Sequence, residues 1–223
     1  KLDAKLPAEM ATAAPWVQPI KAAPYYAMVQ FASPDEILAL EDPGDALPLL
    51  QGAWRYARGE ALVRKGDLAA ARKEAEDIGA IVAEKDLSPL TDGGVPAVHV
   101  LNVARLTVLA RAAAAEGDLA TAIEAMEEAT ALQEDMPYME PPWWYYPSAQ
   151  TLAAFLLQDG QTERAEQLFL ETLTESPNNA WVLYGLAETY KAQGDKNAAK
   201  YANALFKDAW AGDKKSYPSL KAL

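Results

Sequence analysis

One short phrase recurs four times along this chain, each time between two apolar segments with helical spacing. It begins with glycine, continues with aspartate in three of the four copies, and has alanine five residues after the glycine. The copies begin at Gly66, Gly117, Gly160 and Gly194. A tight turn between helices favours glycine, and alanine lets the next helix approach closely. Because one such helix pair cannot bury its apolar face alone, the phrase predicts several helical hairpins that share one continuous core.

The spacing of apolar residues predicts where the hairpins lie. They are expected over residues 49–82, 95–129, 151–173 and 181–210. Frequent prolines before residue 49 allow only short helices, one of them capped by Ser33 and Glu36, which together form a degenerate first hairpin. We therefore predict a proline-rich N-terminal segment (1–48), a repeat array (49–210) and a C-terminal tail (211–223) that either packs back or frays.

The last two turns, Gly160 and Gly194, are 34 residues apart, and a Ser-Pro-Asn-Asn linker lies between them. This period and turn chemistry resemble the tetratricopeptide repeat (TPR). The resemblance implies an all-α, right-handed superhelical solenoid with about four repeats and a degenerate N-terminal hairpin. The two earlier intervals are longer, which indicates insertions at 84–96 and 136–147.

A narrower resemblance rests on two segments. The aromatic and proline-rich residues 136–147, with the stretch from Trp54 to Gly59, resemble the C-terminal half of a group of longer bacterial TPR proteins. The likeness covers about residues 25–210. The N-terminal half of that group has additional repeats and histidine motifs that this chain lacks. A chain that begins at Lys1 rather than at Met is interpreted as processed, trimmed or fragmentary.

Composition argues against several classes of function. A net charge of −12 repels phosphate groups, so nucleic acid is a poor partner. No uncharged apolar run reaches the length of a membrane span. Cysteine is absent and His99 is the only histidine, so we expect no catalytic residue, no cofactor and no metal site. A lone histidine on an apolar helix is more often a structural residue with one hydrogen bond than a ligand.

In repeats of this type, the first helix of each hairpin lines the concave surface. When the helical register is counted from the glycine turns, the outward positions of these helices can be assigned. Together they form a predicted partner groove. Its residues are Tyr56, Glu60, Thr107, Arg111, Gln150, Trp181, Tyr184 and Glu188. Their mixture of aromatic, acidic and single basic side chains suits a peptide or a polar small molecule.

The aromatic loop is the most unusual segment, and prolines flank it. Its predicted site residues are Glu140, Trp143, Trp144, Tyr145 and Tyr146. Four adjacent rings cannot all face the core. They either plug the gap between the second and third hairpins or form a binding surface. Glu140 could pair with Arg105 or Arg111.

Two functional hypotheses follow, and a third possibility is a small-molecule pocket built on Trp143 to Tyr146. In the first, the chain is a non-enzymatic interaction module that binds a peptide or partner protein in the concave groove. In the second, it is the C-terminal part or a subunit of a larger bacterial enzyme or metal-handling protein, whose active groups lie in a missing N-terminal half or another subunit. We expect a bacterial soluble compartment, and the lack of cysteine and of an initial Met inclines this expectation toward the periplasm.

Overall fold

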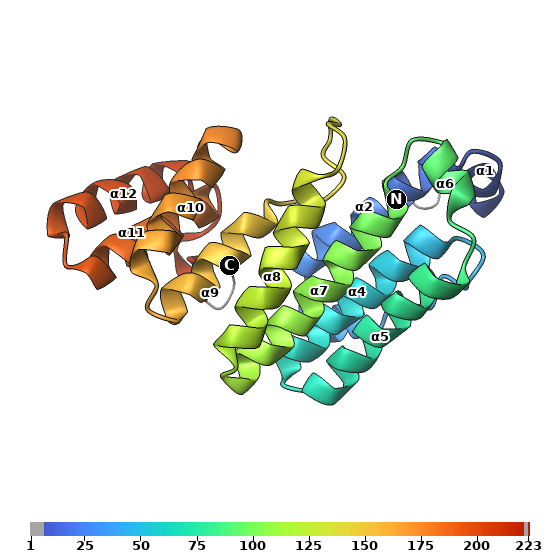
Figure 1. The fold of residues 1–223 in the computed structure, drawn as a ribbon, viewed down its shortest axis with the longest axis horizontal. Helices are drawn as coiled ribbons and strands as arrows, with labels where there is room; N and C mark the ends of the chain where they lie inside the picture. Colours follow the sequence, from blue (N-terminus) through green and yellow to red (C-terminus); the bar gives the residue numbers. More distant parts are fainter. Residues whose placement is uncertain (1–6, 221–222) are drawn as a thin grey trace. The chain divides into compact units, whose positions relative to one another are not determined.

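The computed structural model describes residues 7–220 and 223, and within that part of the chain no residue lies in a β-strand. Helices make up 75% of the structure. They form two compact units, coloured along the sequence in Figure 1. Unit 1 contains the chain up to Asp118 together with Ala131–Tyr145, and unit 2 contains Leu119–Thr130 and Tyr146–Leu223.

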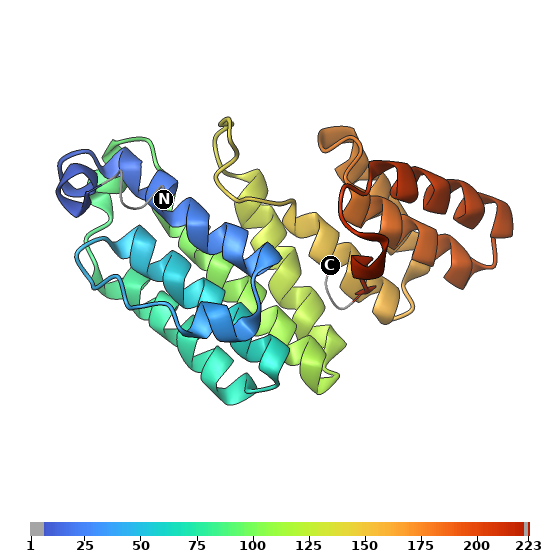
Figure 2. The same cartoon turned by 180° about the vertical axis from the view of Figure 1, so that it is seen from behind.

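Unit 1 is built around the antiparallel helices α4 and α5, and α7 packs against both. α2 and α3 cover α4, as Figure 2 shows for α2 from behind. The helices of this unit are α1 (Ala8–Ala13), η2 (Pro15–Val17), α2 (Gln18–Phe31), α3 (Pro34–Leu38), α4 (Pro48–Lys65), α5 (Leu68–Glu84), α6 (Ser88–Asp92) and α7 (Ala97–Glu116).

Unit 2 contains a run of antiparallel helices in which each packs on the next from α9 to α12, and α9 also contacts α11. Most of α8 belongs to this unit. The helices are α8 (Leu119–Glu134), α9 (Ser148–Gln158), α10 (Thr162–Glu175), α11 (Ala180–Gln193), α12 (Lys196–Ala209) and η3 (Lys214–Ser216).

The recurring phrase folds as expected from its residues. All four turn glycines have left-handed φ angles, between 79° and 88°. At Gly66, the next amide, Asp67 N, donates to Leu62 O at 3.0 Å, while Gly66 N donates to Val63 O at 3.0 Å. The same pair of hydrogen bonds recurs at the other three turns. The Asp67 carboxylate then accepts from Ala70 N, so glycine ends one helix and aspartate caps the next.

A second role for glycine is close approach between helices. A Cβ added to Gly185 in α11 would lie 2.3 Å from Cζ of Phe169 in α10, a ring that is completely buried. The absence of a side chain at this position therefore lets α10 and α11 pack closely.

The predicted fold class, an all-α helical-repeat solenoid of the TPR type, is confirmed. The capping box at Ser33 and Glu36 is also present. The positions of the short helices α1 and α6 were not predicted, and α6 occupies the first expected insertion. The expectation that prolines allow only short helices before residue 49 is wrong for α2, which has 14 residues and contains Pro24. The proposed division into residues 1–48, 49–210 and 211–223 stays a prediction.

Helix α7 is long and apolar enough to pass a length and composition test for a membrane span. However, 61% of its apolar stretch is buried inside the fold, where it contacts α4 and α5. Because α7 buries its apolar side chains against these helices, its composition is that of a core helix.

Candidate partner-binding faces

Four of the predicted groove residues come together in unit 1, and we call them the unit 1 face: Tyr56 and Glu60 on α4, Thr107 and Arg111 on α7. Tyr56 and Thr107 are completely buried, and Glu60 is 5% exposed. Arg111 Nε lies 3.2 Å from Glu60 Oε2, so an ion pair joins the two helices.

The unit 1 face is covered by aromatic side chains of the same chain. Tyr26 of α2 stacks on Tyr145 with ring centroids 5.0 Å apart. The Trp144 ring meets Tyr56 edge-on at 5.0 Å, and it is 1% exposed. The hydroxyls of Tyr56 and Tyr145 lie 2.8 Å apart and share a hydrogen bond. Side chains from two other segments, α2 and the aromatic loop, thus pack on α4.

Burial also sets the electrostatics of this face. Desolvation raises the pKa of Glu60, although the charges of Arg111 and Arg64 act in the opposite direction. Glu60 Oε1 is buried and has no hydrogen-bond partner among the described residues. Burial likewise raises the pKa of the Tyr26 hydroxyl. Burial within the fold therefore accounts for both pKa shifts. In the described part of the chain, no group of three histidine or acidic side chains could hold a metal ion.

The rings of the aromatic loop have different surroundings. Trp144 and Tyr145 point into unit 1, whereas the Trp143 ring is half-buried and its Nε1 donates to Pro137 O at 2.9 Å. Tyr146 belongs to unit 2, where its hydroxyl lies 3.2 Å from Thr151 Oγ1. Trp144 and Tyr145 therefore pack against α2 and α4 within unit 1. The two predicted alternatives, a plug between the second and third hairpins or a binding surface, stay predictions.

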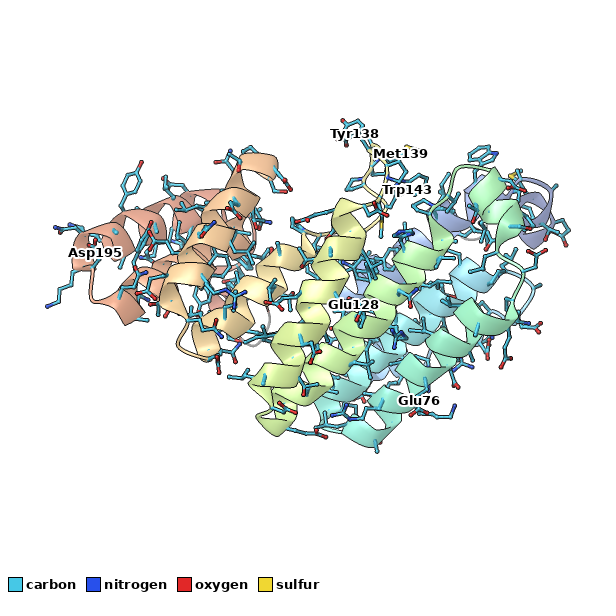
Figure 3. All side chains as sticks on the ribbon, in the orientation of Figure 1. Glu76, Glu128, Tyr138, Met139, Trp143 and Asp195 are labelled. Atoms are coloured by element: carbon cyan, nitrogen blue, oxygen red, sulfur yellow. The ribbon has the colours of Figure 1, made fainter. Side chains whose placement is uncertain are left out.

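The exposed tip of the loop consists of two residues that the sequence did not single out. Tyr138 is 86% exposed and Met139 is 42% exposed. Figure 3 shows both at the outer end of the loop, with Trp143 closer to the helices. Glu140 accepts a hydrogen bond from the Tyr138 hydroxyl at 3.0 Å. Glu140 thus has a local partner, while Arg111 forms an ion pair with Glu60.

The other four groove residues lie in unit 2, and we call them the unit 2 face: Gln150 on α9, with Trp181, Tyr184 and Glu188 on α11. Gln150 is buried and accepts from Asn179 Nδ2 at 3.2 Å. The other three are half-buried and follow one side of α11 at helical spacing. Desolvation and the nearby Glu188 carboxylate raise the pKa of Tyr184.

A ring cluster packs against two residues of the unit 2 face. Trp181 meets Trp210 at 5.4 Å, and Tyr184 meets Phe206 at 5.5 Å. Phe206 and Trp210 also contact each other at 5.7 Å. Phe206 was not predicted in this role, although its place among the apolar positions of the last helix was a usable signal.

Other polar groups are accounted for by contacts within unit 1. His99 Nε2 lies 3.1 Å from Asp135 Oδ2, which fits a structural residue with one polar contact. The Glu74 carboxylate accepts from Arg55 at 2.9 Å and from Arg58 at 2.7 Å, and both guanidinium groups lie over the Trp54 ring. This network ties α4 to α5.

Comparison with known proteins adds family evidence for part of the chain. Residues 105–136 and 156–201 each match a model described as tetratricopeptide repeat. These matches support a TPR-type repeat protein. No curated protein matches the sequence. The likeness to the C-terminal half of longer bacterial TPR proteins stays a prediction.

Two solved structures share the fold. Both contain nearly identical TPR-like repeats of a candidate kinesin light chain from Podosopora anserina, and one of them is a point variant. The variant is 21% identical, with a TM-score of 0.54, over 92% of this chain and 99% of its own. The other is 19% identical, with a TM-score of 0.51, over 92% and 94%. At these identities the likeness concerns the TPR-type fold alone.

Proposed function

We propose that this chain is a non-enzymatic interaction module that binds an extended peptide segment of a partner protein on the unit 2 face. TPR repeats suggest protein–protein interaction as the general function. The second TPR match, residues 156–201, includes Trp181, Tyr184 and Glu188.

One observation carries the choice of the unit 2 face. In unit 1, the corresponding positions Tyr56 and Thr107 are completely buried beneath or beside the chain's own side chains. On α11, Trp181 and Tyr184 remain half-exposed, and the ring cluster fixes their orientation. Aromatic rings that are held in place and still reach solvent bind a partner with little loss of side-chain entropy.

The charges favour a partner peptide with basic residues. Glu188 lies four residues after Tyr184 on the same side of α11, and its carboxylate contacts Lys191 Nζ at 2.5 Å. The net charge of −12 attracts cationic segments over a longer range. We therefore propose that the bound peptide supplies an apolar or aromatic side chain for the rings and a basic side chain for Glu188.

The test uses a displayed library of random peptides selected against the intact chain. Enriched peptides are then measured against a Trp181→Ala, Tyr184→Ala double variant. We expect binding to weaken at least tenfold. Because removal of these rings also disturbs the ring cluster, Glu188→Lys provides a second variant that should selectively weaken basic peptides.

A matched control is Tyr201→Ala, which removes an aromatic side chain that is 68% exposed on α12. It should bind the selected peptides like the unmodified chain. Peptides that bind all four proteins equally would place the partner site elsewhere. If no peptide is enriched, the module hypothesis is wrong, and elemental analysis of the parent polypeptide would test the alternative of a larger enzyme or metal-handling protein.

A further inference from the structure

The segment that follows α12 turns back onto unit 2. Trp210 Nε1 donates to Asp213 O at 3.1 Å, and the Ser216 hydroxyl donates to the same carbonyl at 2.7 Å. Figure 2 shows the chain after α12 running back along the unit toward α9. The sequence left two alternatives for the tail, which either packs back or frays. The described residues of the tail pack back onto unit 2.

The first anchor of this segment is Tyr217. Its ring meets Phe206 edge-on at 4.9 Å and Trp210 at 6.0 Å. These are the same two rings that support Tyr184 and Trp181. Tyr217 therefore contacts the same ring cluster as Trp181 and Tyr184. Pro218, which follows it, is buried and restricts the backbone at this point.

The second anchor lies on α9. Leu223 is 1% exposed, and its carbonyl oxygen accepts a hydrogen bond from the Thr151 hydroxyl. Thr151 is the neighbour of Gln150, which belongs to the unit 2 face. The segment thus contacts α12 through the Tyr217 ring and α9 through the carbonyl oxygen of Leu223.

We propose that this C-terminal segment is an internal competitor for the unit 2 face, and that the partner peptide which displaces it carries an aromatic residue followed by proline, as in Tyr217-Pro218. The proposal rests on the proposed function of that face. An aromatic residue of the partner replaces Tyr217 on Phe206 and Trp210, and the following proline keeps the peptide extended.

The size of the effect follows from tethering. A segment joined to its site by a short linker acts at an effective concentration in the millimolar range. If it occupies the face about nine-tenths of the time, the affinity for an external peptide falls about tenfold, because only the open fraction binds. A variant that weakens one anchor of the segment should therefore bind the external peptide about tenfold more tightly.

The experiment uses the full chain and a fluorescent synthetic peptide with the sequence of residues 213–223. Binding is followed by fluorescence anisotropy. Tyr217→Ala should bind the peptide about tenfold more tightly than the unmodified chain. Tyr217→Phe keeps the ring and should bind like the unmodified chain. Thr151→Val removes the hydroxyl that holds Leu223 while nearly conserving volume, and it should also tighten binding.

Circular dichroism establishes that each variant is folded. Equal affinity of the unmodified chain, Tyr217→Ala and Thr151→Val for the peptide would overturn the competitor proposal. It would also be overturned if library-selected peptides bound through Trp181 and Tyr184 while the 213–223 peptide bound none of the proteins. In that case the proposed function would stand. Loss of both kinds of binding would remove both proposals.

Discussion

Trp144 and Tyr138 belong to the same loop but have opposite surroundings. Trp144 is 1% exposed among Tyr26, Tyr56 and Tyr145, while Tyr138 is 86% exposed. We expect Trp144→Ala to reduce the free energy of unfolding by about 3–5 kcal/mol, because it leaves a cavity. Tyr138→Ala should change it by no more than about 0.5 kcal/mol. Urea unfolding measures the free energy of unfolding of both variants. If the two variants lost similar amounts of it, the buried ring of Trp144 would not be what stabilises unit 1.

Glu60 should make stability depend on pH. Because burial raises its pKa, the folded chain binds the proton more tightly than the unfolded chain does. This contribution is fully present below the unfolded pKa of about 4.3, and it is lost as pH rises through the folded pKa. The stability of the unmodified chain relative to Glu60→Gln should therefore fall from pH 4 toward neutrality. A difference that stays constant or grows over this range, measured by urea unfolding, would contradict the raised pKa.

The sequence predicted which residues share a helix face but not their burial. Tyr56 and Glu60 were correctly placed on one side of a helix, because helical spacing is a local property. The covering residues Tyr26 and Trp144 lie far from Tyr56 in the sequence, and spacing carries no information about such contacts. Whether these positions bind a partner stays a prediction.

At the scale of helices, Gly185 should be the most informative substitution in unit 2. An alanine Cβ at this position would lie 2.3 Å from the buried Phe169 ring. We expect Gly185→Ala to cost about 1–3 kcal/mol, because neither α10 nor the ring can move without loss of packing.

The matched control is Gly79→Ala in α5. Its Cβ would meet only Cδ of Arg105, at 3.3 Å, and that flexible side chain can shift. Alanine also favours the helix by about 0.5–1 kcal/mol relative to glycine, so this variant should be neutral or slightly more stable. Thermal unfolding compares the two, and equal midpoints would mean that close approach at Gly185 is not required.

Helix positions could be predicted from the sequence because both their ends and their spacing are encoded locally. Gly66 supplies the left-handed turn and Asp67 caps the next helix, and neither needs a distant contact. Helices α1 and α6, with six and five residues, are too short to show a periodic pattern. Their position depends instead on tertiary packing.

For the molecule as a whole, charge limits the class of partner. Glu76 and Glu128 point outward from α5 and α8 in Figure 3. With a net charge of −12, we expect no binding of duplex DNA even at low salt, where attraction to phosphate is strongest. An electrophoretic mobility shift assay checks this. Salt-sensitive binding would reveal a basic surface that composition does not disclose.

Composition and repeats together predicted the fold class correctly, since a recurring turn with an apolar period limits the chain to helical hairpins. They could not predict which faces the chain itself covers. Trp144 and Tyr217 both come from segments outside the repeating pattern, and only their packing shows that each contacts a predicted face or its supporting rings.

The four left-handed turns also bear on how such a protein grows. At each turn, the glycine N–H and the N–H of the next residue donate to carbonyl oxygens three and five residues earlier, respectively. An in-frame duplication of the coding sequence for one hairpin therefore carries its complete turn chemistry with it. A chain of this kind can therefore grow by one hairpin at a time, because each added hairpin brings its own turn.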